Sequence, residues 1–402
     1  MNRVVITGIG VVSPVGSTLE DFWSALVEGR SAIGPFSIAR SERLSTRIAA
    51  QVRQFDAAAL FAPKQLAPMD RFSQFAVVAA RAAVRDADLT ISERLALETA
   101  TVIGNASAGQ TTLDDAYFKL YAENSSRLHP LTIPRLMTSA AASQISMDLG
   151  LKGPTFCVGT ACAAGTHAIG LAFHMLRSGQ APVALAGGAE ACLTAGTIKA
   201  WEALRVLSQD TCRPFSRTRS GLVLGEGAAV LLLEERAHAL ARGARVYAEI
   251  LGFGMSADAG DITASDPDGA ARAMRAALKD ARRNADDVGY INAHGTGTMH
   301  NDRSETTALR DVFGPDIRRI AVSSSKAVLG HGLGAAGALE MAVTTLAIHH
   351  QTIPPTANFE AADPDCDLDV VPNVARHAKV NVAMSNSFAF GGLNAVLLAA
   401  RA

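Results

Sequence analysis

The sequence predicts an α/β fold built from two similar halves, and three observations lead to this prediction. The chain has 402 residues, which exceeds the usual size of a single hydrophobic core. Hydrophobic residues make up 49% and charged residues 19%, enough apolar material for a large buried interior. Short apolar strands alternate with helical stretches, and this alternation occurs twice in one order. We therefore expect strands buried between layers of helices.

The first half begins with a β-branched run at residues 4–12 that glycines interrupt, as in a buried strand followed by a turn. An alanine-rich helix at 75–88 leads to a strand at 100–104 and a polar loop at 105–109. A helix that opens at Cys162 stops near Gly179, before the strand at 182–186. Segments 60–66 and 113–134 are expected to be insertions.

The second half repeats these elements in the same order, at residues 247–254, 270–283, 290–293, 334–350 and 394–398. We place the boundary near Val246, which gives an N-terminal half at 1–245 and a C-terminal half at 246–402. Loops from both halves are then expected to meet at one central junction, where α/β sheets bind their ligands.

Composition narrows the class of protein. Lysine plus arginine number 37 and aspartate plus glutamate 38, so no overall field favours nucleic acid or an anionic membrane. We see no apolar run long enough to span a bilayer and no signal-peptide pattern, and expect a soluble cytoplasmic protein. The five cysteines form no CxxC pair and no metal-ligand spacing with the ten histidines. We expect neither a metal nor a cofactor.

Cys162 lies among small residues in Gly159-Thr160-Ala161-Cys162-Ala163-Ala164-Gly165, at a strand-to-helix turn. A helix N-terminus favours a thiolate there, and the Cys162 N–H is a natural donor to a developing oxyanion. A buried structural cysteine is the alternative that this local context leaves open.

Two histidines, His294 and His331, each stand in a glycine-flanked loop of the second half. A thiol with two imidazoles has a specific chemical use, because the thiol can hold an acyl group. The imidazoles can donate hydrogen bonds to the enolate left when a malonyl thioester loses CO2. That carbanion then attacks the acylated cysteine.

Four ordered motifs carry a family resemblance across essentially the whole chain: Thr160-Ala161-Cys162, His294-Gly295-Thr296-Gly297-Thr298 with Asn301-Asp302, Lys326 with Gly330-His331, and Asn386-Ser387-Phe388-Ala389-Phe390-Gly391-Gly392 with Asn394. The chain resembles the elongating β-ketoacyl-acyl carrier protein synthases. The resemblance implies a thiolase-like fold, with two βαβαβαββ halves in five αβαβα layers. It also implies a homodimer, a carrier-protein partner bearing acyl and malonyl groups, and decarboxylative condensation to a 3-oxoacyl thioester two carbons longer.

The resemblance assigns roles residue by residue. It implies that Cys162 is the nucleophile, that His294 and His331 act in decarboxylation, and that Lys326 supports His331. Phe390 matches a gating aromatic residue whose N–H completes the oxyanion hole with that of Cys162. Supporting positions are Glu340, Thr296, Thr298, Asp302 and Glu305, the last two bracing the loop after His294, while Phe388 is expected to be core packing.

Other positions bear on specificity and partners. Ala389 and Leu393 replace a glycine and a threonine of the family pattern, and Ser107 is expected at the deep end of the acyl tunnel. Cationic side chains near the tunnel mouth would steer the acidic carrier protein, and the candidates are Lys64, Arg71, Arg127 and Arg205. Residues 199–205 and 210–215 resemble the nodulation-type and specialised-metabolite branch.

Two other classes of protein share part of this pattern. A thiolase shares the fold but uses a second, C-terminal cysteine, and no cysteine follows Cys366. A chain-length-factor subunit pairs with an active partner but lacks the nucleophile, so Cys162 argues against it.

Overall fold

A computed structural model describes all 402 residues and contains one ten-stranded sheet in the order β10-β9-β13-β14-β8-β1-β7-β6-β4-β5. The first half supplies β1 (Val4–Val12), β4 (Ala100–Gly104), β5 (Thr155–Val158), β6 (Val183–Glu190) and β7 (Gly227–Glu235). The second supplies β8 (Ala248–Ala257), β9 (Tyr290–Asn292), β10 (Ala321–Ser323), β13 (Val382–Ala389) and β14 (Leu393–Ala400). Strands β1 and β8 pair antiparallel, with Val4 opposite Ile250, and so join the two halves.

Each half follows the same path through its own five strands. From the joint outward the order is β1-β7-β6-β4-β5 in the first half and β8-β14-β13-β9-β10 in the second. With the helices between them, each half follows the expected βαβαβαββ succession. The expected boundary at Val246 lies between α11 (Arg236–Ala241) and β8.

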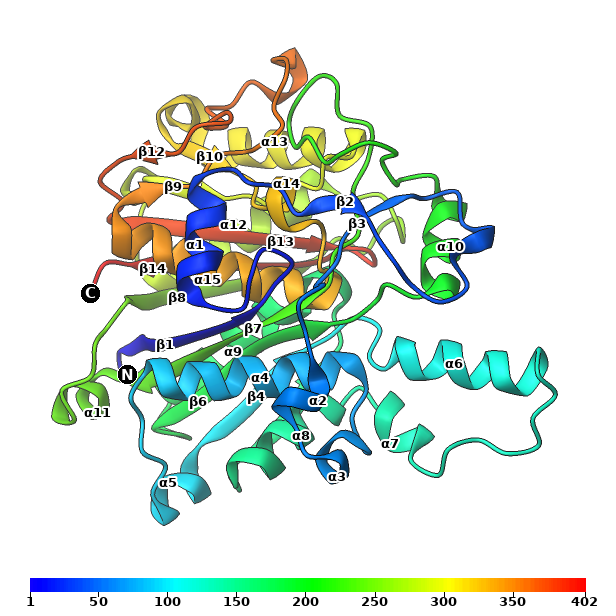
Figure 1. The fold of residues 1–402 in the computed structure, drawn as a ribbon. Coiled ribbons are helices and arrows are strands. Elements are labelled where there is room, and N and C mark those ends of the chain that lie inside the picture. The colour runs from blue at the N-terminus through cyan, green and yellow to red at the C-terminus, as the bar shows by residue number, and fades with distance from the viewer.

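Six helices complete a five-layer arrangement (Figure 1). Helices α4 (Arg71–Asp86) and α8 (Ala140–Leu149) pack on the outer face of the first half, and α12 (Pro267–Ala281) and α13 (Met299–Phe313) cover the second. Between the halves lie α9 (Ala164–Arg177) and α15 (Ala336–His350), which contact strands of both. The predicted thiolase-like architecture is therefore confirmed.

The central helices are buried because apolar or small residues surround them. In α15 every residue from Ala336 to Ile348 is buried, as expected of a helix without a polar face. The two helices approach through glycines: a Cβ atom on Gly337 would lie 2.0 Å from Thr166 Oγ1, and one on Gly165 would lie 2.8 Å from the Ala338 nitrogen. This close contact brings the N-terminal ends of α9 and α15 together.

Helix starts differ slightly from the sequence prediction because caps fix them. Helix α4 begins at Arg71, since the Asp70 carboxylate accepts a hydrogen bond from the Phe72 N–H at 3.2 Å. Helix α12 begins at Pro267, after the capping residue Asp266.

The remaining helices and strands lie outside the ten-stranded sheet and the six helices that pack on it. The expected insertions include α3 (Pro63–Leu66), α6 (Gln110–Tyr121) and α7 (Thr132–Leu136); Figure 1 shows α6 and α7 to the right of the sheet and α3 below α2. The others are α1 (Leu19–Val27), β2 (Ile33–Pro35), β3 (Ile48–Ala50), α2 (Ala57–Leu60), α5 (Glu93–Glu98), α10 (Ala195–Leu204), α14 (Lys326–Leu329), β11 (Thr352–Ile353) and β12 (Arg376–His377). None of the helices combines the length and apolarity that crossing a bilayer requires.

Replacing Gly337 with alanine tests the close contact of the central helices. Helix propensity alone would make Gly337→Ala stabilising by about 1 kcal/mol. The clash with Thr166 should reverse the sign, and we expect a loss of about 1–3 kcal/mol in the free energy of unfolding. Thermal unfolding of Gly260→Ala is the control, because a Cβ atom at Gly260 meets nothing within 4 Å. A stabilised Gly337→Ala protein would contradict this packing.

Candidate active site

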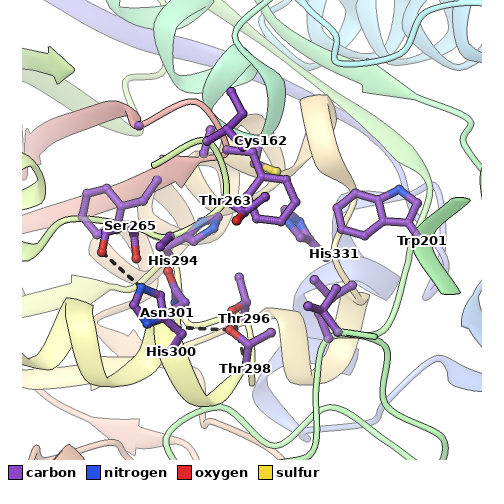
Figure 2. Close-up of a pocket in the computed structure, with 18 residues that line it drawn as sticks. Cys162, Trp201, Thr263, Ser265, His294, Thr296, Thr298, His300, Asn301 and His331 are labelled. Atoms are coloured by element: carbon purple, nitrogen blue, oxygen red, sulfur yellow. Dashed lines mark hydrogen bonds between the residues drawn. The ribbon is translucent and has the colours of Figure 1, made fainter. Parts of the chain in front are cut away.

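Loops from both halves meet around one cavity at the central junction (Figure 2). Cys162 comes from the first half, and His294 and His331 come from the second. The other residues that line the cavity are of two kinds. Hydroxyl, amide and imidazole groups come from Thr263, Ser265, Thr296, Thr298, Asn301 and His300. The apolar part of the wall consists of Trp201, Val206, Leu222, Ile262, Ala264, Phe388, Ala389, Phe390 and Gly392. The structure thus brings the predicted thiol and both predicted imidazoles into one cavity.

Cys162 sits on a short turn between β5 and α9. The turn, Ala161–Ala163, is a single 3₁₀ segment, and Ala161 has a left-handed φ of 46°, a strained conformation for a non-glycine residue. The thiol lies at the N-terminal end of α9 and is 7% exposed. The turn therefore presents the sulfur to the cavity while most of its surface stays buried.

Burial and the charge of Lys326 act in opposite directions on the ionisation of Cys162. Burial raises the pKa of the thiol to about 12, and the positive charge of Lys326 offsets only part of this rise. The carboxylates of Glu190 and Glu340 add to it. Burial thus opposes the thiolate that the helix N-terminus favours, and desolvation is the largest influence on the pKa of this thiol.

His294 and His331 form a perpendicular pair. Their ring centroids are 5.4 Å apart, the ring planes meet at 82°, and each residue is 2% exposed. Burial lowers both pKa values well below the ordinary range, and the charge of Lys326 lowers them further. Both imidazoles are therefore neutral near pH 7, and each can present one N–H donor to the cavity.

Lys326 makes its direct side-chain contact with His294, whereas the prediction concerned its support of His331. Its Nζ lies 3.3 Å from His294 Nδ1 and also donates to the His294 carbonyl oxygen. The reason is topological: β9 and β10 run parallel and side by side, so the residues that follow them meet at one edge. An ammonium group only donates, so Nδ1 accepts and the His294 proton resides on Nε2. The effect of Lys326 on His331 is one of charge.

Glu340 balances this charge from α15. Lys326 and Glu340 form an ion pair in which the two residues are 1% and 2% exposed. Burial raises the pKa of Glu340 to about 7, and the neighbouring ammonium opposes that rise. The pair ties α14 to α15 directly beside the histidines.

Two buried carboxylates hold the loop after β9 by hydrogen bonds to its backbone and to that of Phe215. Glu305 accepts hydrogen bonds from the His294 and Gly295 N–H groups at 2.9 and 2.8 Å. Asp302 accepts from the Phe215 and Gly297 N–H groups at 2.7 and 3.2 Å. These bonds fix the backbone that carries His294.

Two threonines follow in the same loop. The Thr296 and Thr298 hydroxyls lie 2.9 Å apart, and Thr298 caps α13. Both side chains line the cavity, as Figure 2 shows.

Two phenylalanines close one side of the cavity. Phe390 is partly exposed and stacks on Trp201, with 5.7 Å between ring centroids. Phe388 is 4% exposed, as expected of a core residue, yet it also lines the cavity, with its ring centroid 6.0 Å from that of His294. Ser107 is half-buried and is not among the residues that line this cavity.

The predicted carrier-binding set divides in two. Lys64, Arg127 and Arg205 are exposed. Arg71 is only partly exposed, and it donates to buried Glu226 at 2.9 Å and to the Val52 carbonyl oxygen at 2.7 Å. The carboxylate of Glu226 therefore balances the positive charge of Arg71.

Sequence reasoning missed Glu190, which is fully buried at the end of β6. Its carboxylate accepts hydrogen bonds from the N–H groups of Ala106, Ser107 and Gly334, at 2.7, 3.3 and 3.1 Å. Burial raises its pKa to about 7, against the lowering effect of these three bonds. The sequence feature that could have indicated this residue is an acidic residue at the end of the apolar strand Val183–Glu190. Glu190 joins the loop after β4 to the start of α15.

Alkylation tests the protonation state of Cys162. Because only the thiolate reacts, the rate of iodoacetamide alkylation should rise about tenfold per pH unit from about pH 7 to 10, without a plateau. Mass spectrometry of the Cys162 peptide measures this rate. A plateau below about pH 8 would show that the helix N-terminus overcomes burial.

A paired substitution tests the buried ion pair. Lys326→Met leaves the Glu340 carboxylate without its partner, and we expect a loss of about 3–5 kcal/mol in unfolding free energy at alkaline pH. The double variant Lys326→Met with Glu340→Leu should regain most of that loss, since no unpaired charge remains. Urea unfolding measures both variants, and equal stabilities for the single and double variants would contradict the pairing.

Comparisons with known proteins cover almost the whole chain. Residues 1–239 match the family described as "Beta-ketoacyl synthase, N-terminal domain", and residues 247–360 match "Beta-ketoacyl synthase, C-terminal domain". Nodulation protein E of Rhizobium sp. (strain N33) is 49% identical over 98% of both chains. The 3-oxoacyl-[acyl-carrier-protein] synthase 2 of Synechocystis sp. (strain ATCC 27184 / PCC 6803 / Kazusa) is 43% identical over 98% of this chain and 97% of its own.

Solved structures are similar over the whole length. "The ishigamide ketosynthase/chain length factor" matches with a TM-score of 0.96 and 38% identity, over 100% of this chain and 99% of that one. A ketosynthase in a complex described as "type II PKS acyl-carrier protein in complex with its ketosynthase bound to the hexaketide" matches with a TM-score of 0.90 and 32% identity, over 100% of both chains. The predicted resemblance, including its nodulation-type branch, is confirmed, and the chain belongs to the β-ketoacyl synthase family.

Proposed function

We propose that this chain is a β-ketoacyl-acyl carrier protein synthase that condenses an acyl group held on Cys162 with malonyl-carrier protein. The observation that carries the proposal is one buried thiol that shares a cavity with two neutral imidazoles. The thiol serves acyl transfer, and the imidazoles serve decarboxylation. The Cys162 half (1–245) and the histidine half (246–402) thus contribute different chemistry.

In the first step the Cys162 sulfur attacks the carbonyl carbon of the acyl thioester. The N–H groups of Cys162 and Phe390 stabilise the oxyanion of the tetrahedral intermediate. The carrier thiol then leaves, and the proton lost by Cys162 ends on that thiol. The Ala161–Ala163 turn supports this role because it holds the sulfur at the cavity wall.

In the second step the malonyl carboxylate leaves as CO2, and its electron pair forms an enolate. His294 donates from Nε2 and His331 from its N–H to the enolate oxygen, because a neutral imidazole keeps one N–H group for this purpose. The enolate carbon attacks the acyl thioester, and Cys162 departs as a thiolate, which takes a proton from solvent to restore the thiol. The product is a 3-oxoacyl thioester two carbons longer.

An acidic acyl carrier protein is the proposed partner. A structural relative is described in complex with such a protein, and the exposed Lys64, Arg127 and Arg205 are the proposed contacts here. We further propose a homodimer in the cytoplasm. A non-catalytic chain-length-factor role is the second candidate, because one structural relative carries both names, but the presence of Cys162 disfavours it.

Intact-mass analysis tests the proposed nucleophile. Wild-type protein mixed with acyl-carrier protein should gain the mass of one acyl group, and malonyl-carrier protein should discharge it. Cys162→Ala should gain no mass, whereas the control Cys366→Ala, which removes a buried thiol outside the cavity, should behave as wild type. Acylation of Cys162→Ala, or no acylation with any of a panel of chain lengths, would overturn the proposal.

His331→Ala tests the division of labour between the steps. The variant should retain acyl loading of Cys162 but lose malonyl decarboxylation by about 100-fold or more, the usual effect of removing one oxyanion donor. Rapid-quench measurement of the acyl-enzyme and of released CO2 separates the two rates. Parallel loss of both would contradict separate roles.

A further inference from the structure

Trp201 belongs to α10, and its indole lies against the ring of Phe390. The ring planes are nearly parallel, at 23°, with 5.7 Å between centroids. Both residues line the cavity, and Figure 2 shows the indole on the side where His331 lies. Trp201 comes from the first half and Phe390 from the second, so the stack spans the junction between them.

Helix α10 is anchored at both ends, which fixes the position of Trp201. Near its start the Gly196 N–H donates to Asp114 at 2.9 Å. Near its end Glu202 accepts hydrogen bonds from the Ser45 and Thr46 N–H groups at 2.6 and 2.7 Å. Burial opposes the charge of Glu202, but hydrogen bonds led by that of Lys199 lower its pKa to about 2, so the anchor persists at neutral pH.

Phe390, by contrast, sits at a point where the backbone can turn. Gly391 and Gly392 follow it with φ values of 83° and 67°, in the left-handed region that glycine tolerates. A Cβ atom on Gly391 would meet only Leu393, at 3.8 Å, so the space around this residue is open. The Gly391 N–H donates to the Ile262 carbonyl oxygen at 2.7 Å, which ties the turn to the exposed loop at 259–263.

We infer that Trp201 is the positioning residue that latches Phe390 in place and so sets how readily an acyl chain gains access to Cys162. The inference rests on the proposed function. The indole of Trp201 is fixed by α10, and it holds the Phe390 ring, which Gly391 and Gly392 would otherwise allow to move. An incoming acyl chain releases the ring when it replaces this contact. The latch acts on acyl loading and leaves decarboxylation, which depends on His294 and His331, unchanged.

Two substitutions of Trp201 test the latch against a passive wall. Trp201→Leu keeps an apolar surface but removes the stack. The acyl-loading rate from a short soluble thioester should then rise by about two- to tenfold, which is the usual interaction energy of an aromatic pair converted to a rate factor. Trp201→Phe retains a ring and should stay near the wild-type rate. Malonyl decarboxylation should be equal in all three proteins. If Trp201→Leu lowers both the loading rate and the decarboxylation rate, Trp201 serves only to shape the cavity, and the inference is overturned.

Fluorescence follows the stack directly, because the chain has only two tryptophans. Trp23 stacks on His350, so Trp23→Phe preserves a ring there and leaves Trp201 as the sole reporter. Acylation of Cys162 in this variant should shift the Trp201 emission on the time scale of loading. Phe390→Leu should give that shifted emission before acylation. An acyl-enzyme that forms with unchanged Trp201 emission overturns the latch alone, whereas absence of any acyl-enzyme overturns the proposed function.

Discussion

The close contact between α9 and α15 is the constraint on which the site depends. Gly165 and Gly337 let the two helices touch where larger side chains would collide. Each half of the sheet packs on this shared layer, so the starts of both helices are held together. The turn with Cys162 precedes one start and the loop with His331 precedes the other. A duplicated fold thereby produces an asymmetric site, with sulfur from one half and imidazole from the other.

Burial at this junction sets the chemistry as well as the geometry. It raises the pKa of Cys162 and lowers those of His294 and His331, so burial favours the neutral form of all three groups. Among them lies the ammonium of Lys326, which Glu340 balances. Neutral donors in a desolvated cavity stabilise charge that develops during reaction more strongly than they would in water. The arrangement suits an enolate and a tetrahedral oxyanion, which are both transient anions.

The sequence predicted the duplicated fold and the Cys162, His294 and His331 constellation because strand periodicity, glycine turns and ordered motifs are local signals. It did not predict which histidine Lys326 touches, since that follows from the neighbouring positions of β9 and β10. The partly buried pair of Arg71 and Glu226 joins residues 155 positions apart, so no local sequence pattern indicates it. The raised pKa of Cys162 depends on the complete packing around it, which no motif encodes.

The most direct test of a shared site is a single turnover of isolated acyl-enzyme with malonyl-carrier protein, in which CO2, 3-oxoacyl product and freed Cys162 are counted together. The account predicts equal amounts of all three, appearing at one rate. Release of CO2 without discharge of the acyl group, or discharge by hydrolysis without a longer product, would contradict it. Either result would mean that the thiol and the two imidazoles do not act on one substrate pair.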